Sequence, residues 1–506
     1  MVLQVLRAAV LAALLVSAQG VKAQDVTLTA RDGSLSIEGA LVGFDGEFYR
    51  VDTKYGPLTV DGEGVICEGP GCPDMTATFA HLRITGAAEQ GSQLLPGLLQ
   101  AYAATRGLTL STDPLDMGFV AELSDPATGT LLARVTFAPA TPEDSRAALL
   151  KGSADMAVSL TADKGFGARP IALDALIPIA ARDNRLPRIS TADLAAALSG
   201  KFGNWKEVGG PDMPIALHAL RRDSSLQEAL AARLGRDVAA VVEHDSAEAL
   251  AAAVARDPWA LAITGQSARG EARPLPMTDS CGFPLIPARA SVKAEDYPLT
   301  MPVQLLTPRR RLPLFGREFL EFLDHPAAQA AVAKAGFVDR TPESQPMTDD
   351  GLRLLNAIMG AGDDVRLETL KQLANVMRDS ERLSLTFRFE DGSSTLDANS
   401  RDNLTMLARM LATNAFRGEE VILVGFSDGS GNAEANLQLS ESRAMAVLQS
   451  LTEKATDLPP DQPLPGVMAF GEALPMACDT TAAGRRANRR VEVWLRPKGA
   501  TDSQTP

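Results

Sequence analysis

The hydrophobic pattern divides the chain into successive segments of different period. Between residues 24 and 75, the runs VTLTA, SLSIEGALVGF, EFYRVDT and GPLTV alternate apolar and polar residues, as half-buried strands do. Asp32-Gly33 and Asp45-Gly46 provide turn signals between these runs. We expect a small β domain of roughly three to five strands in this segment.

From residue 76 to 343, short apolar runs alternate with helical periods. LRITGAA precedes the helical pattern QLLPGLLQAYAATRG, and ARVTFAP precedes PEDSRAALLKG. Such alternation predicts an α/β domain with helices on both faces of a sheet.

Residues 344–383 place Leu, Ile and Met at helical spacing, interrupted at Gly360-Ala361-Gly362. This pattern predicts a helical linker. Residues 384–498 then mix strand and helix patterns, which predicts a C-terminal α+β domain. The polar residues 499–506 are expected to form a disordered tail.

The clearest candidate chemistry lies on a strand, a turn and a helix near the C-terminus. Val421–Val424 predicts a buried strand, residues 425–431 form the turn, and Ser440 is the expected N-cap of the helix. Asp428 then lies at the exit of the strand and Arg443 in the first helical turn. A cation in that turn opposes the helix dipole, so its placement requires a functional explanation.

Three sequence blocks of this region occur in a recognisable order. They are Gly425, Ser427 and Asp428; Asn436, Leu439, Ser440, Arg443 and Ala444; and Gly484, Arg485, Asn488, Arg489, Arg490, Val491 and Glu492. In order and spacing they resemble the OmpA-like peptidoglycan-binding domain, with Phe426 where that family frequently has histidine. The resemblance implies that residues 384–498 bind the peptidoglycan of the cell wall.

The ligand implied by this resemblance is the meso-diaminopimelate of the wall peptide, which carries an ammonium and a carboxylate on one carbon. Asp428 would bind the ammonium and Arg443 the carboxylate, aided by free N–H groups of the helix. The candidate peptidoglycan-binding residues are Asp428, Arg443, Asn436, Ser440, Arg489 and Arg490. Of the last two arginines, one is expected to line the site and the other to be solvated. The alternative interpretation is an ordinary surface ion pair.

A second resemblance lies in the α/β region. Ile189–Ile215 (ISTADLAAALSGKFGNWKEVGGPDMPI) and Glu295–Pro308 (EDYPLTMPVQLLTP) are similar to segments of the phosphate-type periplasmic solute-binding proteins of ABC transporters. The resemblance covers about half of the chain. It implies that residues 76–343 form two lobes with a ligand cleft between them.

The segments that hold phosphate in that family are altered in this chain. Gly86-Ala87-Ala88-Glu89 replaces a hydroxyl-rich segment, and the carboxylate of Glu89 would repel an oxyanion. The candidate solute-binding residues are Glu89, Ser159, Arg222, Ser224 and Ser225. We therefore interpret the cleft as degenerate for phosphate. An amine or amino acid held between Glu89 and Arg222, or no ligand at all, are the alternatives.

The first 23 residues predict an export signal. Arg7 precedes the apolar run AAVLAALLVSA, and Val21-Lys22-Ala23 places small residues for cleavage before Gln24. The run is too short for a membrane span, and no cysteine follows it for lipid attachment. We expect a mature periplasmic chain without a transmembrane span, associated with the cell wall, with the inner face of the outer membrane as one option.

The four cysteines suggest at least one disulfide bond. Cys67 and Cys72, in CEGPGC, can close a tight loop in an oxidising compartment. Cys281 and Cys478 are either buried thiols or a bond that joins two domains. A zinc site is disfavoured because the chain has four histidines and none lies near a cysteine pair.

Composition and missing motifs narrow the function. The net charge is −14 and aromatic residues make up 5% of the chain, which argues against nucleic acid or an anionic membrane as the main partner. The sequence contains no H-E-x-x-H motif and no Walker loop. We expect no enzyme activity, cofactor or metal, and a periplasmic protein that fixes a solute-binding-like module to the wall. The alternatives are an ABC-transporter receptor that passes its solute to a permease, with wall anchoring secondary, and a structural wall scaffold.

Overall fold

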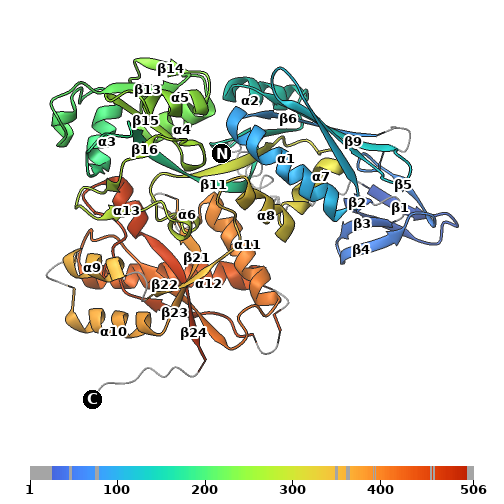
Figure 1. Ribbon diagram of the computed structural model, residues 1–506. Helices are drawn as coiled ribbons and strands as arrows, with labels where there is room; N and C mark the ends of the chain where they lie inside the picture. Colours follow the sequence, from blue (N-terminus) through green and yellow to red (C-terminus); the bar gives the residue numbers. More distant parts are fainter. Residues whose placement is uncertain are drawn as a thin grey trace, which may run out of the picture.

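The computed structural model describes residues 26–44, 48–73, 79–347, 351–360, 365–390, 393, 395–455, 458–459 and 462–498. An N-terminal sheet, a two-lobed α/β domain and a C-terminal α+β domain follow one another along the chain (Figure 1). This arrangement confirms the expected fold class. The expected export signal at residues 1–23 and the expected tail at 499–506 lie outside the described residues.

The N-terminal segment forms a five-stranded antiparallel sheet in the order β4-β3-β2-β1-β5. Its strands are β1 (Val26–Ala30), β2 (Ser36–Phe44), β3 (Phe48–Thr53), β4 (Gly56–Asp61) and β5 (Val65–Glu68). The expected β domain is therefore confirmed. The Asp32-Gly33 turn joins β1 to β2, and Gly33 has a φ of +70°, which favours glycine. The other expected turn, Asp45-Gly46, lies outside the described residues.

The N-terminal sheet is docked onto helix α7 (Leu314–Phe322) of the next domain. Arg311 and Arg317 both donate to the backbone carbonyl of Leu41 in β2, the former at 2.9 Å. The carboxylate of Glu318 accepts from the N–H of Phe44 at 3.3 Å. These bonds fix the sheet to the first lobe.

The first lobe of the α/β domain builds on the parallel strands β6, β9 and β10. Its strands are β6 (Ala80–Gly86), β7 (Thr109–Pro114), β8 (Phe119–Ser124), β9 (Leu131–Pro139) and β10 (Met156–Ser159). Its helices are α1 (Ala88–Thr105), α2 (Pro142–Lys151), α7 and α8 (Pro326–Lys334). A Cβ at Gly86 would overlap the backbone of Val158, so glycine is required where β6 passes β10.

The second lobe has its own strands and helices. The strands of the main sheet are β13 (Ala216–Leu220), β14 (Val242–His244), β15 (Ala260–Gly265) and β16 (Arg273–Pro274). A small three-stranded sheet contains β12 (Ile189–Ser190), β17 (Met277–Thr278) and β18 (Pro284–Leu285). The helices are α3 (Thr191–Leu198), α4 (Ser225–Leu234), α5 (Ala247–Val254) and α6 (Arg289–Lys293), with the 3-10 turns η1 (Trp205–Val208) and η2 (Gln266–Ala268).

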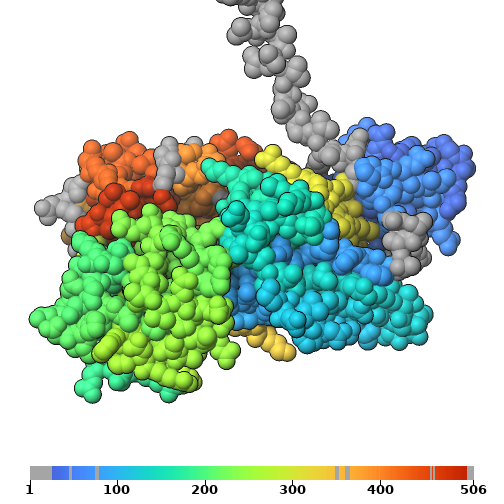
Figure 2. Space-filling model, turned by 90° about the horizontal axis from the view of Figure 1, so that it is seen from above, coloured from blue at the N-terminus to red at the C-terminus, as the bar shows by residue number. Residues whose placement is uncertain are grey.

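Two long strands cross between the lobes. The strand β11 (Gly167–Ala180) pairs with β19 (Thr300–Thr307) through residues 167–175 and with β15 through residues 176–180. One sheet therefore runs through both lobes in the order β14-β13-β15-β11-β19-β10-β6-β9-β8-β7. Figure 2 shows the second lobe, in green, adjoining the first lobe, in cyan and blue.

The C-terminal domain is a five-stranded sheet in the order β20-β21-β24-β22-β23. Its strands are β20 (Ser344–Pro346), β21 (Glu381–Arg388), β22 (Glu419–Phe426), β23 (Gly466–Ala469) and β24 (Arg490–Pro497). Its helices are α9 (Gly351–Gly360), α10 (Leu367–Arg378), α11 (Ala398–Ala412), α12 (Ala433–Lys454) and α13 (Ala482–Asn488). The expected buried strand at Val421–Val424 is confirmed as part of β22.

Both faces of this sheet are covered, which changes the interpretation of residues 344–383. Leu423 and Val493 face the cluster formed with α11 and α12. Val424 and Trp494 face a second cluster to which α9 and α10 contribute. Because β20 also pairs with β21, the segment expected as a linker is not a spacer but an integral layer of the domain.

Two disulfide bonds are present. Cys67 and Cys72 are joined as expected, with their Cα atoms 5.8 Å apart. Cys281 and Cys478 are also joined, with a Cα–Cα distance of 5.5 Å, which decides between the two alternatives that the sequence left open. The second bond connects the second lobe to the C-terminal domain.

The C-terminal domain is bonded to the first lobe as well. Arg409 of α11 donates to Asp324 of the first lobe at 2.7 Å. Near the crossing strands, the buried Arg382 of β21 pairs with the buried Asp296. The domain is thus attached to both lobes rather than tethered. Among the helices in the described part of the chain, none combines the length and apolar character that a membrane span requires.

Candidate functional site

The helix that carries Arg443 begins earlier than the sequence predicts. α12 starts at Ala433, and the side chain of Asn432 caps it by accepting from the N–H of Ala435 at 2.8 Å. The expected N-cap at Ser440 is therefore wrong, and Arg443 lies in about the third turn. The prediction failed because Ser440 is as good a capping residue as Asn432, and the apolar residues before it recur at every second position rather than at helical spacing. The conflict with the helix dipole disappears.

Ser440 and Asn436 support the site from inside the fold. Ser440 is fully buried, donates to the carbonyl of Leu437 at 2.7 Å and accepts from the N–H of Gly471 at 3.1 Å. Asn436, also buried, donates to the carboxylate of Glu472. Both side chains join α12 to the loop after β23, and neither presents its polar atoms on an open surface.

Asp428 is the acidic member of the site and lies two residues beyond the end of β22. Its Oδ2 accepts from Nη1 of Arg489 at 2.9 Å, and its Oδ1 accepts from the N–H of Ser430 at 3.0 Å. Burial alone would raise the pKa of Asp428, but the hydrogen bonds from Arg489 and Ser430 lower it below its usual value. Asp428 is therefore a carboxylate at neutral pH.

Arg443 is the second cation beside this carboxylate. Burial and the charge of Arg489 lower its pKa, and the charge of Asp428 opposes that effect. Within the described residues, its buried Nη1 has no hydrogen-bond partner, and its guanidinium carbon lies 6.0 Å from the ring centroid of Phe389. A buried donor of this kind is costly, which is the property expected of a group that completes its hydrogen bonds with a ligand.

Arg490 does not belong to the surface site, which corrects the expectation that it lines the site or is solvated. Its side chain is fully buried, donates to Glu492 Oε1 at 2.7 Å and to the carbonyl of Leu474 at 2.9 Å, and lies 4.4 Å from the ring centroid of Phe426. Arg489 is the C-cap residue that follows α13, and it reaches Asp428. Arg490 is the first residue of β24, and its side chain enters the core.

Residues 425–429 also spell G-x-S-x-G, a pattern known from serine hydrolases. Ser427 is buried, and its Oγ has no hydrogen-bond partner among the described residues. A nucleophilic serine requires an adjacent base, and among the described residues no base is hydrogen-bonded to Ser427. A Cβ at Gly425 would overlap the carbonyl oxygen of Ser440, which explains the first glycine by close packing against α12.

The candidate solute cleft is bridged by the protein's own side chains. Oε1 of Glu89, in the first turn of α1, accepts from the N–H of Ala247 at the start of α5 at 3.1 Å. These helices belong to different lobes. A second bridge joins Thr161 of the first lobe to Glu228 of α4 at 2.9 Å. The carboxylate of Glu89 thus occupies a backbone donor that a bound oxyanion could otherwise use.

The remaining cleft candidates have local partners. Ser159 is hydrogen-bonded to the backbone of Thr161 at the end of β10. Ser224 caps α4 by accepting from the N–H of Gln227 at 3.3 Å, and Ser225 is the first residue of that helix.

The structure does not bring Arg222 and Glu89 together. Arg222 is largely exposed and pairs with Asp237. It lines a cavity of about 370 Å³ with Asp237, whereas Glu89 lines another of about 760 Å³ with Glu248 and Ser267. The expectation that an amino acid is held between Glu89 and Arg222 is therefore not supported.

Two acidic residues organise the C-terminal domain in a way that the sequence analysis did not predict, although Glu492 belongs to the third sequence block. Glu492 is fully buried and pairs with Arg353, Arg382 and Arg490. Asp479 accepts from the N–H of Gly429 and from the side chain of Asn488. The position of Glu492 in the third block was the signal for the first of them, and nothing in the sequence singled out Asp479.

Comparison with known proteins agrees with this division of the chain. Residues 388–489 match the model of the OmpA family, and residues 77–323 match the model of a PBP superfamily domain. These matches confirm both resemblances that the sequence suggested.

Curated relatives match parts of the chain. A probable lipoprotein, YiaD, of Escherichia coli K12 is 31% identical over 109 residues, which cover 22% of this chain and 47% of the relative. The peptidoglycan-associated lipoprotein of Pseudomonas putida is 34% identical over 112 residues, 22% of this chain and 63% of the relative. The phosphate-binding protein PstS of Borreliella burgdorferi is 40% identical over 63 residues, 12% of this chain and 22% of the relative. The chain spans about half the length of the relatives matched first.

Proposed function

We propose that this chain, which joins a PBP superfamily domain to an OmpA family domain, is a non-enzymatic periplasmic protein that binds peptidoglycan through its C-terminal domain. The solute-binding-like module is then held at the cell wall. The similarity to a protein named peptidoglycan-associated lipoprotein supports the wall as the partner.

The observation that carries the proposal is the polar cluster of Asp428, Arg489 and Arg443. A carboxylate with a lowered pKa interacts with the charge of the half-buried Arg443, whose buried Nη1 has no hydrogen-bond partner among the described residues. Meso-diaminopimelate offers an ammonium and a carboxylate on one carbon. The ammonium would compete with Arg489 for Asp428, and the carboxylate would complete the hydrogen bonds of Arg443.

Binding to sacculi tests the proposal directly. We expect the full chain to sediment with purified sacculi that contain diaminopimelate, because the stem peptides carry the zwitterionic group. Sacculi from which an amidase has removed the stem peptides, leaving bare glycan strands, should retain little protein. Equal sedimentation with both preparations, measured by quantifying bound and free protein, would show that the peptide is not the ligand.

A second candidate function is solute binding in the cleft, as in an ABC-transporter receptor. The two-lobed sheet with its crossing strands favours it, and one partial relative is a phosphate-binding protein. Glu89 opposes an anionic ligand, because its carboxylate already accepts from the N–H of Ala247 across the lobes. The module is therefore best described as degenerate for phosphate, with a structural wall scaffold as the remaining alternative.

The charge of Glu89 can be tested by titration with inorganic phosphate. We expect no measurable heat with the wild-type chain and a measurable heat with Glu89→Gln, because a like charge leaves the site while an acceptor for Ala247 remains. Glu248→Gln, which removes an exposed carboxylate from the same cavity, is the matched control. If neither variant gives a measurable heat with phosphate, the cleft is not an oxyanion-binding site.

A further inference from the structure

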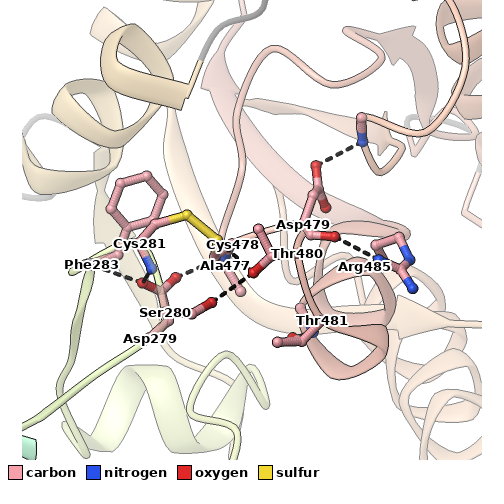
Figure 3. The surroundings of a disulfide bond; sticks show 12 residues. Asp279, Ser280, Cys281, Phe283, Ala477, Cys478, Asp479, Thr480, Thr481 and Arg485 are labelled. Carbon is pink, nitrogen blue, oxygen red and sulfur yellow. Dashed lines mark hydrogen bonds between the residues drawn. A yellow bond between two sulfur atoms is a disulfide. The ribbon is translucent and has the colours of Figure 1, made fainter. Parts of the chain in front are cut away.

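The loop between β23 and α13 joins the wall-binding site to the second lobe. Its Cys478 forms the disulfide with Cys281, which lies in the turn between β17 and β18 (Figure 3). The two cysteines are 197 residues apart in the sequence. The bond therefore attaches the loop to a different domain.

A buried carboxylate of the second lobe reinforces this attachment. Asp279 is 7% exposed. Its Oδ1 accepts from the N–H groups of Cys281 at 2.9 Å and Phe283 at 2.8 Å, and its Oδ2 accepts from the N–H of Cys478 at 2.7 Å. Ser280 and Thr480 are hydrogen-bonded at 2.8 Å beside it. One side chain thus orders both sides of the junction (Figure 3).

The next residue, Asp479, continues from the junction into the wall-binding site. Its Oδ2 accepts from the N–H of Gly429 at 2.8 Å, and its Oδ1 accepts from Nδ2 of Asn488 at 2.7 Å. Gly429 follows Asp428, and Asn488 precedes Arg489. The two oxygens of one carboxylate therefore hold the neighbours of both members of the Asp428–Arg489 ion pair.

We propose that Asp279 and Cys281 of the second lobe position the peptidoglycan-binding pair through Cys478 and Asp479. The proposal rests on the proposed wall-binding function and deepens it. None of the four residues needs to touch the ligand. They fix the backbone on either side of the ion pair, and ligand binding in the C-terminal domain becomes coupled to the geometry of the second lobe.

The test compares two disulfides in the full chain. We expect Cys281→Ser/Cys478→Ser to bind a soluble diaminopimelate-containing stem peptide about tenfold more weakly than wild type, within the usual range of coupling between sites. Cys67→Ser/Cys72→Ser, which breaks the disulfide of the N-terminal sheet, should bind as wild type. Calorimetry measures both affinities. If the thermal midpoint of the C-terminal domain is unchanged, the lower affinity comes from altered positions of the binding residues and not from unfolding of the domain.

A spectroscopic signal reports the positioning itself. The amide resonance of Gly429 should shift and lose protection from hydrogen exchange in Cys281→Ser/Cys478→Ser, and Asp279→Asn should produce a smaller shift in the same direction. If that double variant does not fold, the Cys281–Cys478 bond can be reduced in the folded Cys67→Ser/Cys72→Ser protein, which retains no other cysteine pair. The oxidised and reduced forms are then compared in the same way. Unchanged affinity and an unchanged Gly429 signal would overturn the proposal. Absence of binding by the wild type would instead overturn the wall-binding function.

Discussion

Replacing Glu492 with glutamine is expected to lower the free energy of unfolding of the C-terminal domain by about 3–5 kcal/mol, because removing one partner of a buried ion network leaves the others uncompensated. The carboxylate is fully buried. It accepts from Nε of Arg490 at 2.7 Å and from the indole N–H of Trp494 at 2.8 Å, and it pairs with Arg353 and Arg382. Arg353 and Arg490 would lose this anion in the variant, whereas Arg382 keeps its pair with Asp296.

Native-state hydrogen exchange of the β24 amides measures this loss in the C-terminal domain alone. Glu420→Gln is the matched control, because Glu420 pairs with Arg496 on the neighbouring strand but its side chain is 44% exposed. The control should cost less than about 1 kcal/mol. Equal losses for the two variants would mean that burial does not govern the energetics of these pairs.

The same prediction has a defined pH dependence. Burial alone would raise the pKa of Glu492, but Arg353, Arg382 and Arg490 hold it well below its usual value of 4.5. A group whose pKa falls on folding stabilises the folded state above its unfolded pKa, and this stabilisation is lost as the pH falls through the folded pKa. The stability difference between wild type and Glu492→Gln should therefore be complete near neutral pH and shrink below about pH 4.5.

The sequence revealed the parts of the site that depend on local pattern. The continuous apolar run Val421–Val424 placed Asp428 at a strand exit, and the three blocks identified Arg443 and Arg489. The sequence did not place the start of α12, because Asn432 and Ser440 are both good capping residues. Only tertiary contacts, such as the bond from Gly471 to Ser440, decide between them.

Other features were not predictable because they depend on contacts between distant segments. The apolar spacing of residues 344–383 fits an isolated helical spacer and a layer on a sheet equally well. The segment forms a layer because its apolar side chains pack in the cluster that contains Val424 and Trp494 of the sheet. Likewise, the position of Glu89 fits a ligand-binding residue, but its carboxylate accepts from the N–H of Ala247 of the other lobe. A carboxylate in a cleft can bind a ligand or replace one, and composition does not distinguish these roles.

The attachment of the C-terminal domain to both lobes limits how the α/β domain can move. A receptor that opens and closes changes the distance between its lobes. Here Arg409 holds Asp324 of the first lobe, and the Cys281–Cys478 bond holds the second lobe. A change in the distance between the lobes would therefore strain two attachments of the same domain. This geometry favours a fixed module at the cell wall over a receptor with freely moving lobes.

Replacing Arg443 with methionine is expected to weaken binding of a diaminopimelate-containing stem peptide by about 2–5 kcal/mol, the usual cost of truncating one partner of a buried charge pair. Stability should not fall with affinity. The buried Nη1 of Arg443 has no hydrogen-bond partner among the described residues, so an apolar side chain of similar length removes an unsatisfied donor. Calorimetry should therefore show weaker peptide binding by Arg443→Met, and thermal unfolding should show no loss of stability. Glu492→Gln, in contrast, should lose stability.

Two further variants define what Arg443 contributes. Arg443→Lys keeps the charge but loses the planar pair of donors, so it should recover only part of the affinity. Arg366→Met removes an arginine whose side chain is 78% exposed in the same domain, and it should bind as wild type. If Arg443→Met binds the peptide as tightly as wild type does, the carboxylate of the ligand is bound elsewhere, and Arg489 becomes the alternative cation. In that case the ligand would separate Asp428 from Arg489 and bind to both of them, and Arg443 would not bind its carboxylate.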